Sequence, residues 1–215
     1  GLWAKPSGVE GVAQFTLAPD TAGTFQIRSF AASSEGLVVS GSLKLRPDGG
    51  LEQLNIARLV VDENNFAATV IPRESGPLLL EVEGENFDLR PFMGHLFDPL
   101  GGMDTALDIS LTFGQVMVGN NQIISDVEGV ISLNAGRVRS ADGLGIMSNG
   151  APMTVKLSDL AGEQNIVITS PDAGEFLSTF DIFYGAKGGN LTIAARIDHD
   201  LSGEPMVGVV TVDEF

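Results

Sequence analysis

Hydrophobic and polar residues alternate one by one through several stretches of this chain. The alternation is clearest in residues 37–45, 107–113, 153–158 and 191–198. A period of two is typical of a β-strand with one face toward a core and the other toward water. We therefore expect a strand at each stretch. Their apolar positions are Leu37, Val39, Leu43, Leu45, Leu107, Ile109, Leu111, Phe113, Met153, Val155, Leu157, Leu191, Ile193, Ala195 and Ile197.

Short connections separate the alternating stretches. Glycine makes up 27 of the 215 residues and proline another 10, and this glycine share is well above the ordinary share of about 7%. Residues 47–50, 120–121 and 149–150 combine Pro, Asp, Asn and Gly as turns do. Frequent turns between strands favour an antiparallel sheet and disfavour long helices.

Two segments depart from the alternation and predict short helices. In the first, Ser170 suits the N-cap, Pro171 the first helical position and Asp172 the first turn. The second is residues 88–97, where a proline again suits the first turn. The first helix would carry one apolar stripe formed by Phe176, Leu177, Phe180 and Phe183.

Glycines that precede strand-like runs recur along the chain at a nearly constant spacing. Gly41 and Gly129 each open a strand-like run, and their separation is 129 − 41 = 88 residues. The glycine pairs at 101–102 and 188–189 each precede a strand, 188 − 101 = 87 residues apart. The chain is therefore interpreted as one elongated domain, residues 1–215, made of two tandem repeats of about 87 residues, roughly 36–122 and 123–215. Chance similarity of two β-rich stretches is the alternative.

The charge of the chain excludes several classes of partner. Twelve Lys and Arg stand against 28 Asp and Glu, a net charge of −16, and the isoelectric point is about 4.2. Nothing in such a chain could neutralise a run of phosphates, so nucleic acid is excluded as a partner. Cysteine is absent, which excludes disulfide scaffolds, thiolate metal sites and cysteine nucleophiles.

Chemistry-bearing residues do not form a recognisable site. His95 stands among apolar residues, and His199 lies between two aspartates in an expected turn. The oxygen-rich residues 62–65 and 48–50 lack the alternating pattern of a calcium loop. The carboxylates of Glu81, Glu83 and Glu85 have strand spacing and suit a wet strand face. We expect no catalytic residue, no metal, no cofactor and no enzymatic activity.

The apolar strand faces must be covered by something. The two expected helices supply few apolar side chains for so many strands, so a long sheet would have to curl around its own apolar face. The sequence thus predicts an all-β fold, mostly antiparallel: a curled, twisted sheet that forms an apolar groove, with one or two short helices. The competing hypothesis is a structural or interaction β-module with a closed, dry core. A glycan-active enzyme would need converging carboxylates, and the pattern provides none.

Most of residues 36–215 resembles a known family. The second half contains SPDAGEFLSTF at 170–180, IFY at 182–184 and GGNLT at 188–192, and the chain ends in DEF at 213–215. The first half contains GSL at 41–43, LNI at 54–56 and GENFDLRPF at 84–92. In these passages the chain resembles the AsmA-like C-terminal region of Gram-negative envelope proteins, the YhdP branch in particular, within the wider AsmA/TamB group.

That resemblance implies an excerpt of a long protein on the periplasmic face of the inner membrane, with its membrane anchor outside this chain. Members of the group are thought to form elongated β-structures with an apolar lumen that carries phospholipid between the inner and outer membranes. The partners would be phospholipid acyl chains, and the family supplies no catalytic residues. From the strand pattern we expect the groove lining to comprise Leu107, Ile109, Leu111, Phe113, Met153, Val155, Leu157, Leu191 and Ile193.

Overall fold

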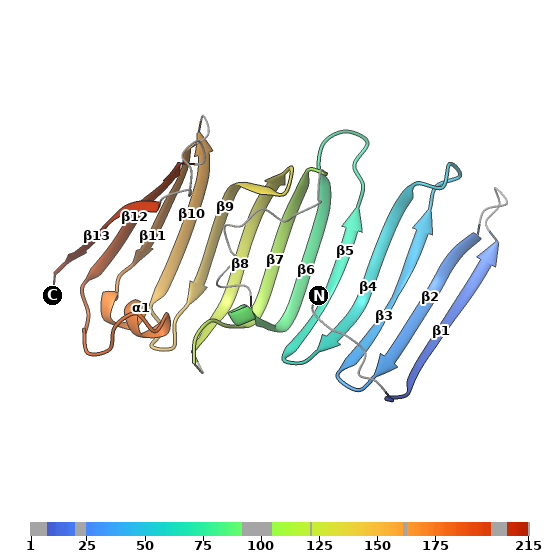
Figure 1. The fold of residues 1–215 in the computed structure, drawn as a ribbon, viewed down its shortest axis with the longest axis horizontal. Coiled ribbons are helices and arrows are strands. Elements are labelled where there is room, and N and C mark those ends of the chain that lie inside the picture. The colour runs from blue at the N-terminus through green and yellow to red at the C-terminus, as the bar shows by residue number, and fades with distance from the viewer. Residues whose placement is uncertain are drawn as a thin grey trace.

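Thirteen β-strands form one sheet in a computed structural model that describes residues 8–19, 25–91, 105–120, 122–160, 163–198 and 206–214. Each strand pairs with the strands that precede and follow it in the chain, so the sheet is one elongated, twisted layer (Figure 1). The all-β prediction is confirmed. The elements are β1 (Gly11–Pro19), β2 (Phe25–Ser34), β3 (Leu37–Leu45), β4 (Leu51–Val61), β5 (Asn64–Ile71), β6 (Leu78–Asp88), β7 (Leu107–Met117), β8 (Ile123–Asn134), β9 (Arg137–Ile146), β10 (Pro152–Leu160), β11 (Glu163–Ser170), α1 (Ala173–Thr179), β12 (Asn190–Asp198) and β13 (Met206–Asp213).

All pairings but one are antiparallel, as the frequent turns predict. The exception is β6 with β7, which run parallel from the Leu78–Leu107 pair to the Asp88–Met117 pair. The connection between these two strands is residues 89–106, most of which lie outside the described part of the chain. Turns close the antiparallel pairs: the amide of Gly150 donates to the Met147 carbonyl across the β9–β10 turn at 2.9 Å.

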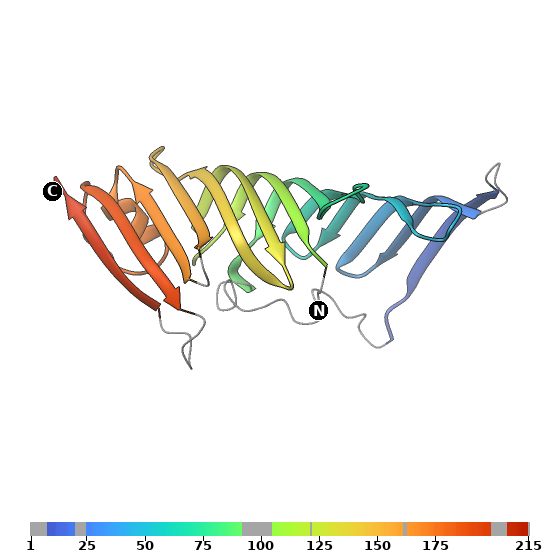
Figure 2. The same cartoon turned by 90° about the horizontal axis from the view of Figure 1, so that it is seen from above.

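The helix α1 lies against one face of the sheet near β10, β11 and β12 (Figures 1 and 2). It forms where expected but begins later, because Asp172 is the N-cap and its Oδ1 accepts a hydrogen bond from the Glu175 amide at 2.9 Å. Ser170 instead ends β11. Its hydroxyl accepts a hydrogen bond from the Asp172 amide at 3.1 Å, so the predicted cap at Ser170 was wrong.

The helix also ends earlier than the predicted apolar stripe requires. Asp181 has a φ of 55°, the left-handed conformation that closes many helices, and its amide donates to the Ser178 carbonyl at 3.2 Å. The Ile182 amide donates to the Leu177 carbonyl at 2.8 Å, which completes the motif. Phe183 therefore lies beyond the helix and is 56% exposed, so its place in the stripe was wrong.

The second expected helix, residues 88–97, falls mostly outside the described residues. Asp88 still belongs to β6, and a single short turn at 90–91 follows it. The Asp88 carboxylate pairs with the Arg90 guanidinium, with Oδ1 and Nε 2.8 Å apart, and this pairing lowers the pKa of Asp88. The segment that leaves β6 therefore starts from a fixed ion pair.

The proposed duplication has a counterpart in the order of the elements. Strands β3 to β6, a connection and β7 correspond in order to β8 to β11, α1 and β12. The pairing differs, because β6 and β7 are parallel whereas β11 and β12 are antiparallel. Both stretches belong to one continuous sheet, and the repeat itself stays a prediction.

Candidate functional site

One register row crosses the whole sheet without a polar residue. In an antiparallel or parallel ladder, directly paired residues place their side chains on the same face. Following the pairs from β1 to β13 gives one position per strand, and each is apolar or glycine. The row is Phe15, Phe30, Gly41, Ile56, Ala68, Val82, Leu111, Gly129, Gly143, Val155, Ile168, Ile193 and Val210.

The neighbouring row on the same face has the same character across all thirteen strands. We call the face that carries both rows the apolar face. The second row is Leu17, Ile27, Leu43, Leu54, Val70, Leu80, Ile109, Ile131, Ala141, Leu157, Ile166, Ala195 and Gly208. The opposite face differs: there Asn55, Thr69, Glu81 and Ser110 are successive partners.

The nine residues predicted to line a groove all lie on the apolar face. Their register partners place Leu111, Val155 and Ile193 in the first row and Ile109 and Leu157 in the second. Phe113, Met153 and Leu191 are buried at 5%, 6% and 1% exposure, and the other members vary in burial. Shared orientation follows from the structure, whereas lipid contact stays a prediction for all of Leu107, Ile109, Leu111, Phe113, Met153, Val155, Leu157, Leu191 and Ile193.

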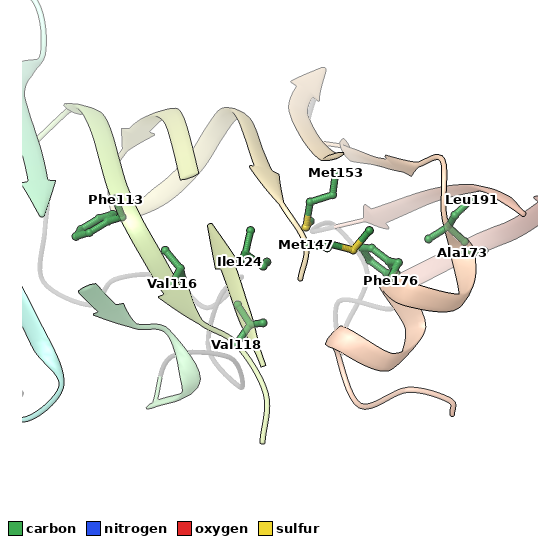
Figure 3. Packing of buried hydrophobic residues seen from close by; sticks show 9 residues of the cluster. All are labelled: Phe113, Val116, Val118, Ile124, Met147, Met153, Ala173, Phe176 and Leu191. Carbon is green, nitrogen blue, oxygen red and sulfur yellow. The ribbon is translucent and has the colours of Figure 1, made fainter. Parts of the chain in front are cut away.

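Much of the apolar face is accessible in the described part of the chain. Side chains such as Val39, Ile56 and Leu80 are only half-buried, although their strands are central in the sheet. The tightest packing lies toward the C-terminal half, where Phe176 of α1 joins Phe113, Met153 and Leu191 in one buried cluster (Figure 3). A closed core would need a second layer, and among the described residues the sheet is a single layer with one helix against it.

A hollow of about 590 Å³ opens on the apolar face between β8 and β12. Every residue that lines it is apolar or glycine, and Phe176 of α1 and Phe180 just after the helix form one wall. Val155, Ile168 and Ile193 of the first row form part of its floor. Its size is within the range of ordinary ligand sites, about 300–1,000 Å³, so its chemistry suits an apolar ligand.

Gly174 permits the close packing that holds α1 to the sheet. A Cβ atom at this position would lie 2.4 Å from the Ala186 carbonyl oxygen. The amides of Ala173 and Gly174 donate to the carbonyls of Gly189 and Gly188, at 2.7 and 3.2 Å. These bonds satisfy two of the free amides at the helix start and attach α1 to the segment before β12.

Side-chain bonds attach the helix to two further turns. Asn149 Nδ2 donates to Asp172 Oδ2 at 2.9 Å, and the Ser148 hydroxyl donates to Glu175 Oε1. Beyond the helix, Asp181 Oδ2 accepts from the Asn120 amide at 3.0 Å, and Oδ1 accepts from the Tyr184 hydroxyl. The α1 segment is therefore held at the β7–β8 and β9–β10 turns as well as at β12.

The hydrogen bonds at Asp181 shift two pKa values. The Tyr184 hydroxyl, and after it the Asn120 amide, stabilise the carboxylate and lower the pKa of Asp181. In return, the bond to that carboxylate raises the pKa of Tyr184. Tyr184 is exposed and Asp181 is half-buried at the surface, so we attribute a local fastening role to them rather than a catalytic one.

A polar group at the strand ends escaped the sequence analysis. Arg139, Asp159 and Gln164 come together beyond the Leu157–Ile166 pair of the second row. The alternation itself contained the signal. Asp159 follows the apolar positions 153, 155 and 157 at the same spacing of two, and Gln164 precedes Ile166 and Ile168 in the same way. A polar residue at a position that should carry an apolar side chain marks the place where the apolar face becomes polar.

The described residues contain neither a candidate metal cluster nor a membrane-spanning helix. No group of three or more His, Asp or Glu side chains lies close enough there to hold a metal ion. His95 and His199 lie outside the described residues. No helix within the described ranges combines the length and hydropathy needed to cross a membrane.

Comparisons with known proteins add no family assignment. Models of protein families, curated proteins and solved structures were all searched with this chain, and none of the three comparisons gave a match. The likeness to AsmA-like proteins therefore rests on the sequence passages alone.

Proposed function

We propose that the apolar face binds phospholipid acyl chains, and that the chain is a segment of an inner-membrane-anchored periplasmic protein of AsmA-like type that conducts such lipids between the two membranes. The observation that carries the proposal is the pair of apolar rows that crosses every strand. The sequence resemblance supports the location and the envelope-maintenance role.

An acyl chain is chemically suited to such a surface. Its methylene groups need no hydrogen-bond partner, and each one transferred from water to an apolar surface contributes about 0.8 kcal/mol. Because the attraction follows buried area and has no preferred direction, adjacent positions along the rows offer a chain nearly equal sites. A row without polar side chains therefore favours movement along the sheet over capture at one point.

The hollow beside α1 offers a place on this path that the helix covers from one side. It combines floor residues of the first row, such as Ile168, with the rings of Phe176 and Phe180 from the helix. These two rings lie 4.7 Å apart between centroids. A chain lying there would be covered on two sides, so we expect it to dwell longest between α1 and the sheet.

Photo-crosslinking from adjacent residues tests the proposal with an internal control. Ile168 and Val167 are neighbours on β11 and point to opposite faces: Ile168 lines the hollow, and Val167 is 40% exposed on the polar side. A benzophenone amino acid would replace each in turn, and the protein would be incubated with dioleoyl phosphatidylcholine vesicles.

The proposal predicts acyl-chain adducts from position 168 and few from position 167. Equal yields at both positions would indicate nonspecific adsorption and would contradict the proposal. Adducts from neither position, in protein shown to be folded, would contradict it as well. Intact-protein mass spectrometry measures the yield directly.

A further inference from the structure

A polar group lies beyond the residues that line the hollow, where β9, β10 and β11 begin or end. Arg139 Nη1 donates to Asp159 Oδ2 at 2.6 Å. Asp159 pairs with Gln164 in the β10–β11 ladder, immediately beyond the apolar Leu157–Ile166 pair. Leu157 and Ile166 both line the hollow, so the polar group continues the same face.

Local geometry explains why an arginine reaches this face. The β8–β9 register shifts between the Ser132–Ser140 and Leu133–Val138 pairs, which leaves Arg139 as the extra residue of a β-bulge. Arg139 has the parity of Ala141 and Gly143, so the alternation of β9 already directs its side chain to the apolar face. It precedes Ser140, whose partner Ser158 precedes Asp159, and the guanidinium reaches that carboxylate on β10. The Arg139 side chain remains 47% exposed, whereas the Asp159 side chain is only 8% exposed.

Gln164 supplies a second acceptor beside that carboxylate. The residue is 3% exposed, and its Nε2 donates to the Val138 carbonyl at 2.6 Å. This bond fixes which end of the amide faces Val138, because a carbonyl can only accept. Gln164 Oε1 is left without a hydrogen-bond partner among the described residues, although buried acceptors are normally satisfied.

We propose that these three residues bind the headgroup of a zwitterionic aminophospholipid whose acyl chain occupies the hollow. The Arg139 guanidinium binds the phosphate, and Asp159 together with Gln164 Oε1 accepts hydrogen bonds from the primary ammonium group. A carboxylate offers about four acceptor positions, so Asp159 can accept from the ammonium and keep Arg139. This inference rests on the proposed function, because it assumes that a lipid chain enters the hollow.

The arrangement discriminates among lipid headgroups by charge and by donors. Phosphatidylglycerol carries a phosphate for Arg139, but its headgroup brings no cation to Asp159. Phosphatidylcholine carries a cation but has no N–H to donate to Gln164. Phosphatidylglycerol offers only neutral hydroxyl donors, so phosphatidylethanolamine alone of these three supplies both an anion for Arg139 and charged N–H donors for the two acceptors. Charged hydrogen bonds are among the strong ones, so we expect selectivity of about tenfold.

The test measures selectivity separately from uptake. The 215-residue chain is incubated with vesicles containing equal parts of dioleoyl phosphatidylethanolamine, phosphatidylglycerol and phosphatidylcholine, and bound lipid is quantified by mass spectrometry. The variant is the double change Arg139→Gln with Asp159→Asn, which removes both charges of the Arg139–Asp159 pair together. The control is Arg196→Gln with Glu163→Gln, an ion pair at 3.6 Å on the polar face.

We expect about tenfold enrichment of phosphatidylethanolamine in the wild type and in the control. In the double variant, the bound lipids should return to the vesicle ratio while total uptake is unchanged. Lipid uptake by the wild type without enrichment of phosphatidylethanolamine overturns the headgroup site but leaves the proposed function standing. Enrichment that persists in the double variant has the same consequence. Absence of any uptake overturns both. If the double variant unfolds, Gln164→Leu replaces it, with lost enrichment expected and retained enrichment overturning the role of Gln164.

Discussion

Gly143 of β9 lies directly opposite Val155 of β10, and open space lies above it on the apolar face. A Cβ atom at Gly143 would meet only the Glu128 carbonyl oxygen, at an ordinary contact distance of 3.6 Å. Glycine is disfavoured within strands because it adds no packing. Here its missing side chain contributes room to the hollow, of which Gly143 is a lining residue.

Filling that room should block lipid without unfolding the protein. Gly143→Leu adds an apolar side chain in a backbone conformation open to any residue, so we expect unchanged or higher thermal stability and several-fold lower lipid uptake. Ser140→Leu adds the same bulk to the exposed polar face of the same strand, opposite Ser132 and Ser158, and should leave uptake unchanged. Equal uptake by Gly143→Leu and wild type would place the lipid elsewhere.

Changing Phe176 or Phe183 to Ala should show which of the two rings packs against the sheet. Phe176 is 3% exposed within the buried cluster, so Phe176→Ala should cost about 3–5 kcal/mol of unfolding free energy. Phe183, 56% exposed beyond the helix, should cost no more than about 0.5 kcal/mol when changed to Ala. Urea denaturation measures both. Similar losses in the two variants would show that α1 is not packed through Phe176.

The Asp181–Tyr184 bond predicts a shifted tyrosine titration. Tyr184 is the single tyrosine of the chain, so tyrosinate absorbance reports on it alone. The bond raises the pKa of Tyr184 above its ordinary value of 10.0, and Asp181→Asn should bring the midpoint back toward 10.0. A midpoint unaffected by that change would show that the bond is not formed in solution.

The hydrogen bond between Tyr184 and Asp181 should be lost at both low and high pH. Because the pKa of Asp181 is lowered in the folded protein, its contribution to stability is present above pH 3.8 and is lost as the pH falls through the lower folded pKa. Because the pKa of Tyr184 is raised in the folded protein, its contribution to stability is present below pH 10.0 and is lost as the pH rises through the higher folded pKa. The amide shift of Asn120, followed by NMR, should therefore be constant between these limits and change outside them.

A carboxylate placed on the open part of the apolar face should be tolerated. Ile109 is half-buried between Leu80 and Ile131, so Glu at position 109 can reach water and should cost little stability while reducing lipid uptake. Phe113 on the same strand is 5% exposed and contacts Phe66 and Phe87. Phe113→Glu should unfold the protein, because a buried unpaired charge costs several kcal/mol. Unfolding by Ile109→Glu would instead indicate a dry core at Ile109.

Alternation predicted the strands and the face that each residue occupies. The expected stretches at 37–45, 107–113, 153–158 and 191–198 all lie in strands, and their apolar positions lie on one side. This succeeds because side-chain direction follows parity in a regular strand, and it is interrupted only at bulges such as the one between Ile27 and Phe30. The order of the strands also follows simply, since each pairs with its neighbours in sequence.

Features that depend on tertiary contacts could not be predicted in the same way. Alternation carries no direction, so the parallel β6–β7 pair left no sign in the sequence pattern. Both Ser170 and Asp172 can cap a helix, and the continuation of β11 to Ser170 decided between them. Parity places Arg139 and Asp159 on one face, but their meeting depends on the β9–β10 register, which alternation does not specify.

The central claim is that the apolar face binds acyl chains, and lipid analysis of the purified chain tests it most directly. The protein is mixed with dioleoyl phosphatidylethanolamine vesicles, separated from them by gel filtration, and extracted for mass spectrometry of bound lipid. Our account predicts that phospholipid co-elutes with the protein in near-stoichiometric amount and is strongly reduced in Gly143→Leu. A folded wild-type protein that carries no lipid and takes up none from the vesicles would contradict the account.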